Sequence, residues 1–248
     1  VEKTRDRIER ARNLLCFFGV ASLSLLDTEP AAIFRVGTCA DPSTCALIAW
    51  LRAGTRSAHD VETEPINLKG IEHAVGAFRQ LTAGSVRSAV NDLRSILASN
   101  GVALALVPAL PKTAAHGATH WLGPNKAVLQ LSDRYKRADI FWFSFFHEIG
   151  HLLLHGKRPG VYVNRIRGER DANEREADRF ATDTLIPPDA FTEFATRPRF
   201  SAAAVRDFAD AIGIHPGIVV GRLQYERLVP RTHLNALRED FDLSGIED

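Results

Sequence analysis

Near the middle of this 248-residue chain, two histidines and a glutamate form the pattern His-Glu-x-x-His, as His147, Glu148 and His151. If the segment is a helix, residues four apart lie one turn above each other on the same face. His147 and His151 could then bind one metal ion through their imidazole rings. Glu148 would lie beside that ion, where its carboxylate could accept a proton from water. The spacing therefore predicts the zinc helix of a metallopeptidase, with Glu148 as the general base.

A catalytic zinc ion needs a third protein ligand, and the chain offers two candidates. His155 lies a further turn along the same helix, and ligands at i, i+4 and i+8 would span about 12 Å, too far for one ion. Glu174 precedes Asp178 by four in the segment Asn-Glu-Arg-Glu-Ala-Asp, residues 173–178. This segment resembles the Asn-Glu-x-x-x-Asp helix of thermolysin-like peptidases. The resemblance implies that Glu174 binds zinc and that Asp178 hydrogen-bonds a ligand histidine, which would fix its orientation.

Two further parts of a peptidase site stay open at this point. Peptide substrates usually pair with an edge strand beside such a helix, and residues 117–121 are the expected edge. A side chain must also stabilise the negative oxygen that forms when the carbonyl is attacked. His120, Tyr162 and Arg167 are alternatives for that role, and the sequence does not choose among them.

The surrounding segments predict an α+β fold that is mainly helical. Apolar residues first recur with helical spacing, up to about residue 97. Apolar runs of strand length then follow between residues 102 and 132, still ahead of the two histidines. The expected helices are 2–18, 67–81 and 85–97, and the expected strands are 102–107, 117–122 and 127–132. We expect the strands to form a small antiparallel sheet, packed on a buried zinc helix from Asp139 to Gly156 in a gluzincin-like arrangement. An earlier helix that starts at Pro42 is expected to end at Gly54, and residues 157–170 are expected to form a loop.

Changes in composition along the chain predict three regions. Residues 1–100 form a helical N-terminal region, residues 101–196 the zinc metallopeptidase core, and residues 197–248 a C-terminal helical subdomain. Ala209 and Gly213 are four apart, as a helix-turn-helix needs, but the second helix carries few cations for phosphate contacts. We therefore expect this subdomain to pack on the core.

Charge and cysteine content restrict the class of protein. The net charge of +1 gives no global argument for binding nucleic acid or an anionic membrane. No stretch approaches the roughly 20 apolar residues of a membrane span, and acidic residues alternate with the N-terminal arginines, unlike in a signal peptide. Cys16, Cys39 and Cys45 have no Cys-x-x-Cys spacing, which favours free thiols in a reducing compartment over a disulfide framework. An approach of Cys39 to Cys45 stays open as the alternative. These features predict a cytoplasmic protein.

Three segments carry a resemblance to a known family. They are Phe-His-Glu-Ile-Gly-His-Leu-Leu-Leu-His-Gly at 146–156, Glu-x-Glu-Ala-Asp-x-Phe-Ala at 174–181 and Leu-Ile-Pro at 185–187. Together with residues 208–224 they resemble the ImmA/IrrE family of bacterial and phage zinc metallopeptidases. That family often has asparagine where Asp178 stands, which keeps an oxygen acceptor. The resemblance implies an intracellular protease acting on a regulator, typically a helix-turn-helix repressor in phage, mobile-element or stress control.

The chain closely resembles long HigA-type regulators, in which an XRE helix-turn-helix module precedes the peptidase-like domain. Residues 10–20 resemble the segment after that module, so DNA binding is expected only through an N-terminal module that is missing here. The resemblance implies a repressor or a cognate toxin as the protein partner, and it allows a homodimer. The alternative function is an antitoxin or transcriptional regulator that uses the domain for binding or sensing without proteolysis. Glu148 favours the protease, since a purely structural zinc site needs no general base.

Overall fold

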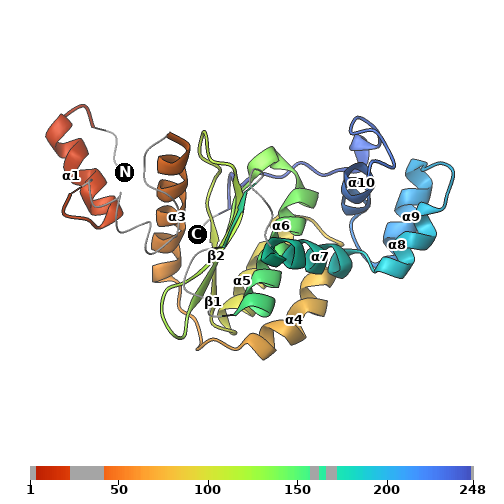
Figure 1. The fold of residues 1–248 in the computed structure, drawn as a ribbon, viewed down its shortest axis with the longest axis horizontal. Coiled ribbons are helices and arrows are strands. Elements are labelled where there is room, and N and C mark those ends of the chain that lie inside the picture. The colour runs from red at the N-terminus through yellow and green to blue at the C-terminus, as the bar shows by residue number, and fades with distance from the viewer. Residues whose placement is uncertain (1–3, 23–41, 157–161, 166–171, 247–248) are drawn as a thin grey trace.

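The structure, a computed structural model, describes residues 4–22, 42–156, 162–165 and 172–246. The helices shown in Figure 1 are α1 (Arg7–Phe18), α3 (Pro42–Asp60), α4 (Leu68–Leu81), α5 (Val86–Ala98), α6 (Ala138–His155), α7 (Ala172–Leu185), α8 (Pro188–Ala195), α9 (Ala202–Ile212) and α10 (Pro216–Tyr225). The strands are β1 (Val102–Leu106), β2 (Ala115–Trp121), β3 (Ala127–Leu131) and β4 (Tyr162–Arg165), and the short 3-10 helices are η2 (Arg134–Lys136) and η3 (Asn235–Leu237). The fold is α+β and mainly helical, which confirms the predicted class.

The strands form one mixed sheet in the order β1-β3-β2-β4. Strand β2 pairs antiparallel with β3 and β4, but β1 pairs parallel with β3, so the sheet is not purely antiparallel as predicted. The cause lies in the connection from β1 to β2, which carries Pro108 and Pro111 and is too long for a tight turn. Strand β3 returns from the following hairpin into the gap between β1 and β2. Every residue of β1 is buried, and burial on both faces is typical of parallel pairing.

Helix α3 covers one face of the sheet, and α5 and α6 cover the other (Figure 1). Small residues allow α3 to approach closely, since Ala58 packs on Ala103 and Ala105. A Cβ at Gly54 would lie 2.0 Å from Oε1 of buried Gln130 in the sheet. Gly54 therefore serves this helix–sheet contact, and the expectation that it ends the helix is wrong.

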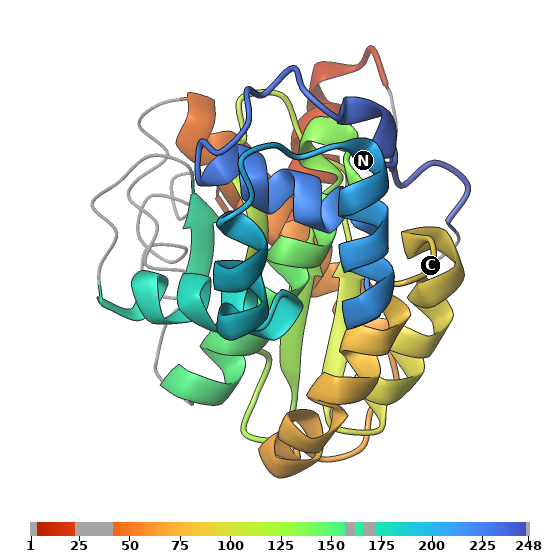
Figure 2. The ribbon, with the colours of Figure 1, turned by 90° about the vertical axis from the view of Figure 1, so that its right-hand side faces the viewer.

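The main hydrophobic core lies between the α6 side of the sheet and the helices from α4 to α10. Phe145 and Phe146 of α6 are fully buried, as the apolar residues all round this helix predicted. Val219, Val220 and Leu223 of α10 are equally buried in the same core. Figure 2 looks onto the C-terminal helices, which lie in front of α6. The division into three regions stays a prediction. None of the described helices is both long and apolar enough to cross a membrane.

A buried ion pair joins the first turn of α6 to the C-terminal segment. Arg238 donates from Nε and Nη2 to the two carboxylate oxygens of Asp139, at 3.1 and 2.8 Å. Its Nη1 donates to Oε1 of Gln224 on α10 at 3.1 Å. A Cβ at Gly221 would lie 2.6 Å from Oδ2 of Asp139, so α10 needs a glycine to pass this carboxylate. The bidentate pair thereby fixes the position of α10 on α6.

Replacing Asp139 with alanine is expected to lower the free energy of unfolding by about 3–5 kcal/mol, because the Arg238 charge stays buried without its partner. Asp183→Ala is the control, since it removes an exposed ion pair with Arg179 on α7. That change should cost less than about 1 kcal/mol. Urea denaturation of both variants measures the difference, and equal losses would contradict the role assigned to Asp139.

The cysteines differ from the sequence-based expectation. Cys45 is disulfide-bonded, whereas Cys16 is free and exposed. Cys39 lies outside the described residues. The prediction of three free thiols is therefore wrong, because spacing along the chain does not reveal which cysteines meet in space. The bond also removes the cysteine argument for a reducing compartment.

Candidate metal centre and active site

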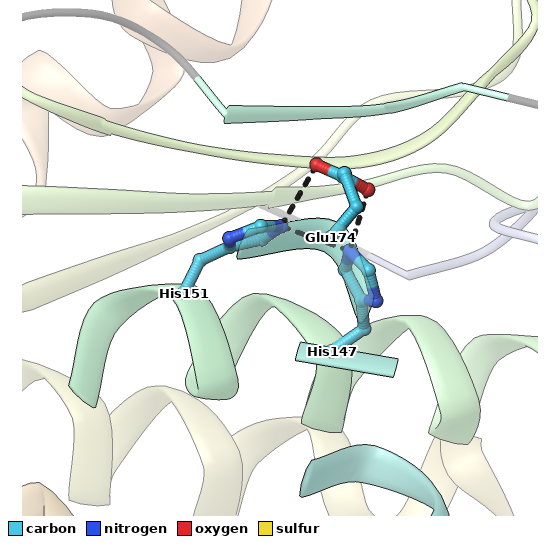
Figure 3. A group of neighbouring side chains, drawn as sticks. All are labelled: His147, His151 and Glu174. Carbon is cyan, nitrogen blue, oxygen red and sulfur yellow. Dashed lines mark hydrogen bonds and ion pairs between the residues drawn. The ribbon is translucent and has the colours of Figure 1, made fainter. Parts of the chain in front are cut away.

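Three side chains from two helices converge on one point, as Figure 3 shows. His147 and His151 lie one turn apart on α6, and their Nε2 atoms are 2.9 Å apart. The Glu174 carboxylate reaches across from α7, with oxygens 3.4 Å from Nε2 of His147 and 3.2 Å from Nε2 of His151. Ligand atoms of all three residues lie within 4.8 Å of one another. The structure thus brings the three predicted ligands together.

These separations fit a tetrahedral metal site. With metal–ligand bonds of 2.0–2.1 Å, ligand atoms in a tetrahedron lie about 3.3 Å apart. The three observed separations, 2.9, 3.2 and 3.4 Å, lie close to that value. Two imidazoles and one carboxylate leave a fourth position for water or substrate, which is the pattern of a catalytic site. The group could therefore hold a metal ion, and its donor atoms suit zinc.

The crossing of α6 and α7 depends on a small residue at the contact. A Cβ at Gly150 would lie 3.2 Å from the Cα of Ala177 and 3.2 Å from the ring of Phe180. Ala177 is fully buried at this point. Glu174 lies one turn before Ala177, so the close crossing places its carboxylate opposite the two histidines.

Asp178 contacts the outer nitrogen of a predicted ligand. Its Oδ1 lies 3.0 Å from Nδ1 of His147, which directs Nε2 towards Glu174. Burial would lower the pKa of His147, but hydrogen bonds to Asp178 and Glu174 outweigh burial and raise that pKa to about 9. Burial would raise the pKa of Glu174, but hydrogen bonds to the two histidines lower it to about 2. Without a metal ion, a proton on His147 therefore balances these carboxylates, and a cation would displace it.

Glu148 is fully buried against β2. The Thr119 hydroxyl donates to its Oε2 at 2.7 Å. A Cβ at Gly117 would lie only 2.6 Å from its Oε1, so the carboxylate fits only because this residue is glycine. Oε1 has no hydrogen-bond partner within the described part of the chain, which leaves it available to a water molecule. Burial raises the pKa of Glu148, although the two neighbouring histidines oppose that shift.

His155 lies beside the metal group without joining it. Its ring is 5.2 Å from that of His151, measured between centroids, and its Nε2 is 3.6 Å from Oε2 of Glu176. The candidate metal group found among the described residues does not include it. The Glu176 side chain is 62% exposed, in agreement with the expectation that it faces solvent.

One of the three alternatives for stabilising the oxyanion is in the wrong place. Neighbouring residues of a strand point to opposite faces, and Thr119 points to Glu148. His120 therefore points to α3, where its Nε2 lies 3.1 Å from Oγ1 of Thr55. Burial there lowers the pKa of His120 to about 4. Arg167 and the side chain of Tyr162 lie outside what the structure describes.

His116 lies on the metal side of the sheet, although the sequence did not single it out. The pairing of β2 with β4 shifts register between Ala115 and Ala118, and both alanines pack on the α3 side. This irregularity turns His116 into a cavity that Phe143 of α6 also lines. Burial, together with nearby cations, lowers the pKa of His116 to about 4, so its ring is neutral at pH 7. A β-bulge has no local sequence pattern, which explains why regular alternation missed this residue.

Strand β2 is not the edge of the sheet. It is paired with β3 on one side and β4 on the other, so the expectation that residues 117–121 bind a substrate strand is wrong. The strand beyond it is β4, which also contacts α6. Residues 157–170 were expected to form a loop, but 162–165 are a strand. Four residues are too few for a periodic signal, so only their pairing with β2 reveals them.

Comparison with known proteins agrees with this geometry. Residues 107–222 match the family model of Peptidase_M78, described as the IrrE N-terminal-like domain. The matched region contains the three residues of the metal group as well as Glu148 and Asp178. The match supports the ImmA/IrrE relationship and indicates a metallopeptidase-like domain, and it does not address HigA-type regulators. No curated protein matches the chain.

Proposed function

We propose that this chain is a zinc-dependent endopeptidase that cleaves a peptide bond in a regulatory protein. The observation that carries the proposal is the convergence of His147, His151 and Glu174 within 4.8 Å, next to buried Glu148. A purely structural metal site would not need a further carboxylate with an unpartnered oxygen beside it. The family match over residues 107–222 supports the same activity.

The roles of the side chains follow from their positions. A zinc ion would supply Lewis acidity and activate water for attack on the peptide carbonyl. Glu148 accepts the proton of the attacking water and donates it to the leaving amine as the C–N bond breaks. Thr119 holds the second oxygen of that carboxylate, and Asp178 keeps His147 oriented. His116, neutral and turned into the adjoining cavity, is a candidate hydrogen-bond donor to the carbonyl oxygen as negative charge develops.

The proposal includes a substrate class and a location. The substrate is a helix-turn-helix repressor or a cognate toxin, and the activity is cytoplasmic, where such regulators act. The resemblance to repressor-cleaving metallopeptidases supports this part. Any DNA binding would come from a separate N-terminal module.

The test is incubation of the zinc-loaded protein with the repressor or toxin encoded beside its gene. We expect about one zinc per chain and cleavage of the partner at a defined bond. A chelator should abolish cleavage, and added zinc should restore it. A partner that binds equally with or without zinc and stays intact at high protein concentration would instead support a non-proteolytic regulator.

Thr119→Val is expected to lower kcat/KM by about 10- to 100-fold, because a hydrogen bond to a charged group is worth roughly 1.5–3 kcal/mol. The loss should fall on kcat with little change in KM, since Thr119 orients the general base and does not bind the substrate. Thr119→Ser keeps the hydroxyl and should retain most activity. Steady-state kinetics of both variants, with thermal unfolding as a check, distinguish lost positioning from lost stability.

A further inference from the structure

A cavity of about 650 Å³ lies where α6, α7 and α10 meet. Its apolar wall consists of Ile140, Phe143, Leu185, Ile186 and Ile218. This volume falls within the range of sites that enclose small ligands or large side chains. His116 also lines this cavity, but the apolar wall has no part in the proposed hydrolysis and is available as a receptor for an apolar group.

The cavity adjoins the metal group along α6 and α7, the two helices that carry the three residues of that group. Phe143 lies one turn before His147 on α6, and their ring centroids are 6.2 Å apart. Thr182, one turn after Asp178 on α7, also lines the cavity. From Phe143 to Asp139 the wall lies about 6–12 Å along the helix from His147. An extended peptide covers about 3.3–3.6 Å per residue, so the cavity would receive side chains two to four residues from the scissile bond.

Positive charge surrounds the cavity. Four of its lining residues are arginines and Asp139 is its only acidic one, among the residues that the structure describes. Three arginines form ion pairs, Arg137 with Asp240, Arg222 with Glu226 and Arg238 with Asp139. The fourth, Arg231, is exposed, and its guanidinium makes no ion pair or hydrogen bond with any described residue. Within the described part of the chain nothing pairs with this cation, so it can bind a carboxylate from outside.

Two exposed tyrosines stand at the rim. The side chains of Tyr135 and Tyr225 are 57% and 65% exposed, and both line the cavity. Tyr135 has a φ of 67°, in the left-handed region that a tyrosine seldom adopts. Strained residues of this kind are concentrated at binding and active sites. Aromatic rings with a polar tip are also well suited to recognising a peptide at a rim.

We propose that this cavity determines the sequence specificity of the enzyme. It takes a large apolar side chain, such as phenylalanine or leucine, two to four residues from the scissile bond, and Arg231 pairs with an acidic residue next to it. Lysine or arginine at that neighbouring position would be rejected by Arg231. This inference rests on the proposed peptidase function and names its substrate class, an apolar–acidic segment.

The test uses three dye-labelled decapeptides that contain Phe-Asp-Asp, Ser-Asp-Asp or Phe-Lys-Lys at the same positions. Fluorescence anisotropy measures their binding to the zinc-loaded full chain carrying Glu148→Gln, which should leave them uncut. The Phe-Asp-Asp peptide should bind at least ten-fold more tightly than either of the others. Arg231→Glu should reverse the preference for Asp over Lys, and Ile218→Trp, which fills the cavity, should remove the preference for Phe over Ser. Arg206→Glu, exposed on α9, is the matched control and should change none of the three affinities.

Each outcome decides a separate question. Ile218 is buried, so if Ile218→Trp lowers the thermal stability, exposed Arg231 alone carries the test. Equal affinity for the three peptides, or a preference that Arg231→Glu leaves unchanged, would overturn the proposed specificity. Selective binding of a Phe-Asp-Asp peptide that the wild-type protein never cleaves would refute the peptidase function and keep the cavity as a recognition site. Cleavage of all three peptides without selective binding would support the peptidase function and refute the cavity as a recognition site.

Discussion

Glu148→Gln is expected to lower kcat/KM for cleavage of the partner by about 10²- to 10⁴-fold, the usual contribution of a general base. The substitution keeps the shape of the side chain, so it still fits against Gly117 and still accepts the Thr119 hydrogen bond. What it loses is the ability to take a proton from water. Zinc should stay bound at about one ion per chain, because Glu148 is not among the three residues of the metal group.

The measurement combines initial cleavage rates with metal content by mass spectrometry. Glu176→Gln is the matched control, since it makes the same change on an exposed glutamate of α7 and should leave the rate unchanged. A Glu148→Gln protein that retained more than a tenth of the wild-type rate would show that another group accepts the proton. Loss of zinc together with activity would instead make Glu148 part of the metal site.

The metal group could be predicted from sequence because its geometry is largely local. His147 and His151 lie on one face of one helix through the helical repeat alone, and the apolar residues around them predicted that this helix is buried. Glu174 needed a second helix whose spacing resembles known zinc sites. The predicted ligand set therefore depended on only one non-local step, the crossing at Gly150.

The order of the strands and the position of His116 could not be predicted in this way, because they depend on which strands pair and in which register. Periodicity locates β1, β2 and β3 but does not reveal that β3 lies between the other two. Strand β4 is visible only through its pairing. The register shift in β2 exchanges two faces of the strand, so His116 reaches the cavity while His120 faces α3. A strict alternation of faces would place these two histidines on the same face of the strand.

Two glycines show the same limit of prediction from sequence. Gly117 was expected within a strand, yet nothing in its neighbours indicated that Glu148 would lie against it. Gly54 was expected to end a helix, and it instead allows that helix to lie on Gln130. In both positions the reason for the glycine is a close approach between elements far apart in the chain.

Glu174→Gln is expected to have the largest effect on metal binding. It replaces an anionic oxygen with a neutral amide between two imidazoles, and zinc affinity should fall by more than about 100-fold, beyond the 10- to 100-fold typical of residues that only orient a ligand. In the wild-type protein, affinity should rise as the pH rises from 7 to 9. The reason is that His147, with its pKa raised to about 9, must lose its proton before it can bind zinc.

Zinc affinity, measured by competition with a chelating dye, should fall more on substitution of Glu174 than on substitution of Asp178. Asp178→Ala removes the partner of Nδ1 of His147 and should lower zinc affinity about 10- to 100-fold. Asp178→Asn keeps an oxygen acceptor and should lower it less. Asp183→Asn, exposed on the same helix, is the control and should have no effect. If Glu174→Gln bound zinc as tightly as the wild type while Asp178→Ala did not, the third ligand would have to be reassigned. The proposed hydrolysis would then lose its geometric basis, because the open fourth position is defined by the three ligands together.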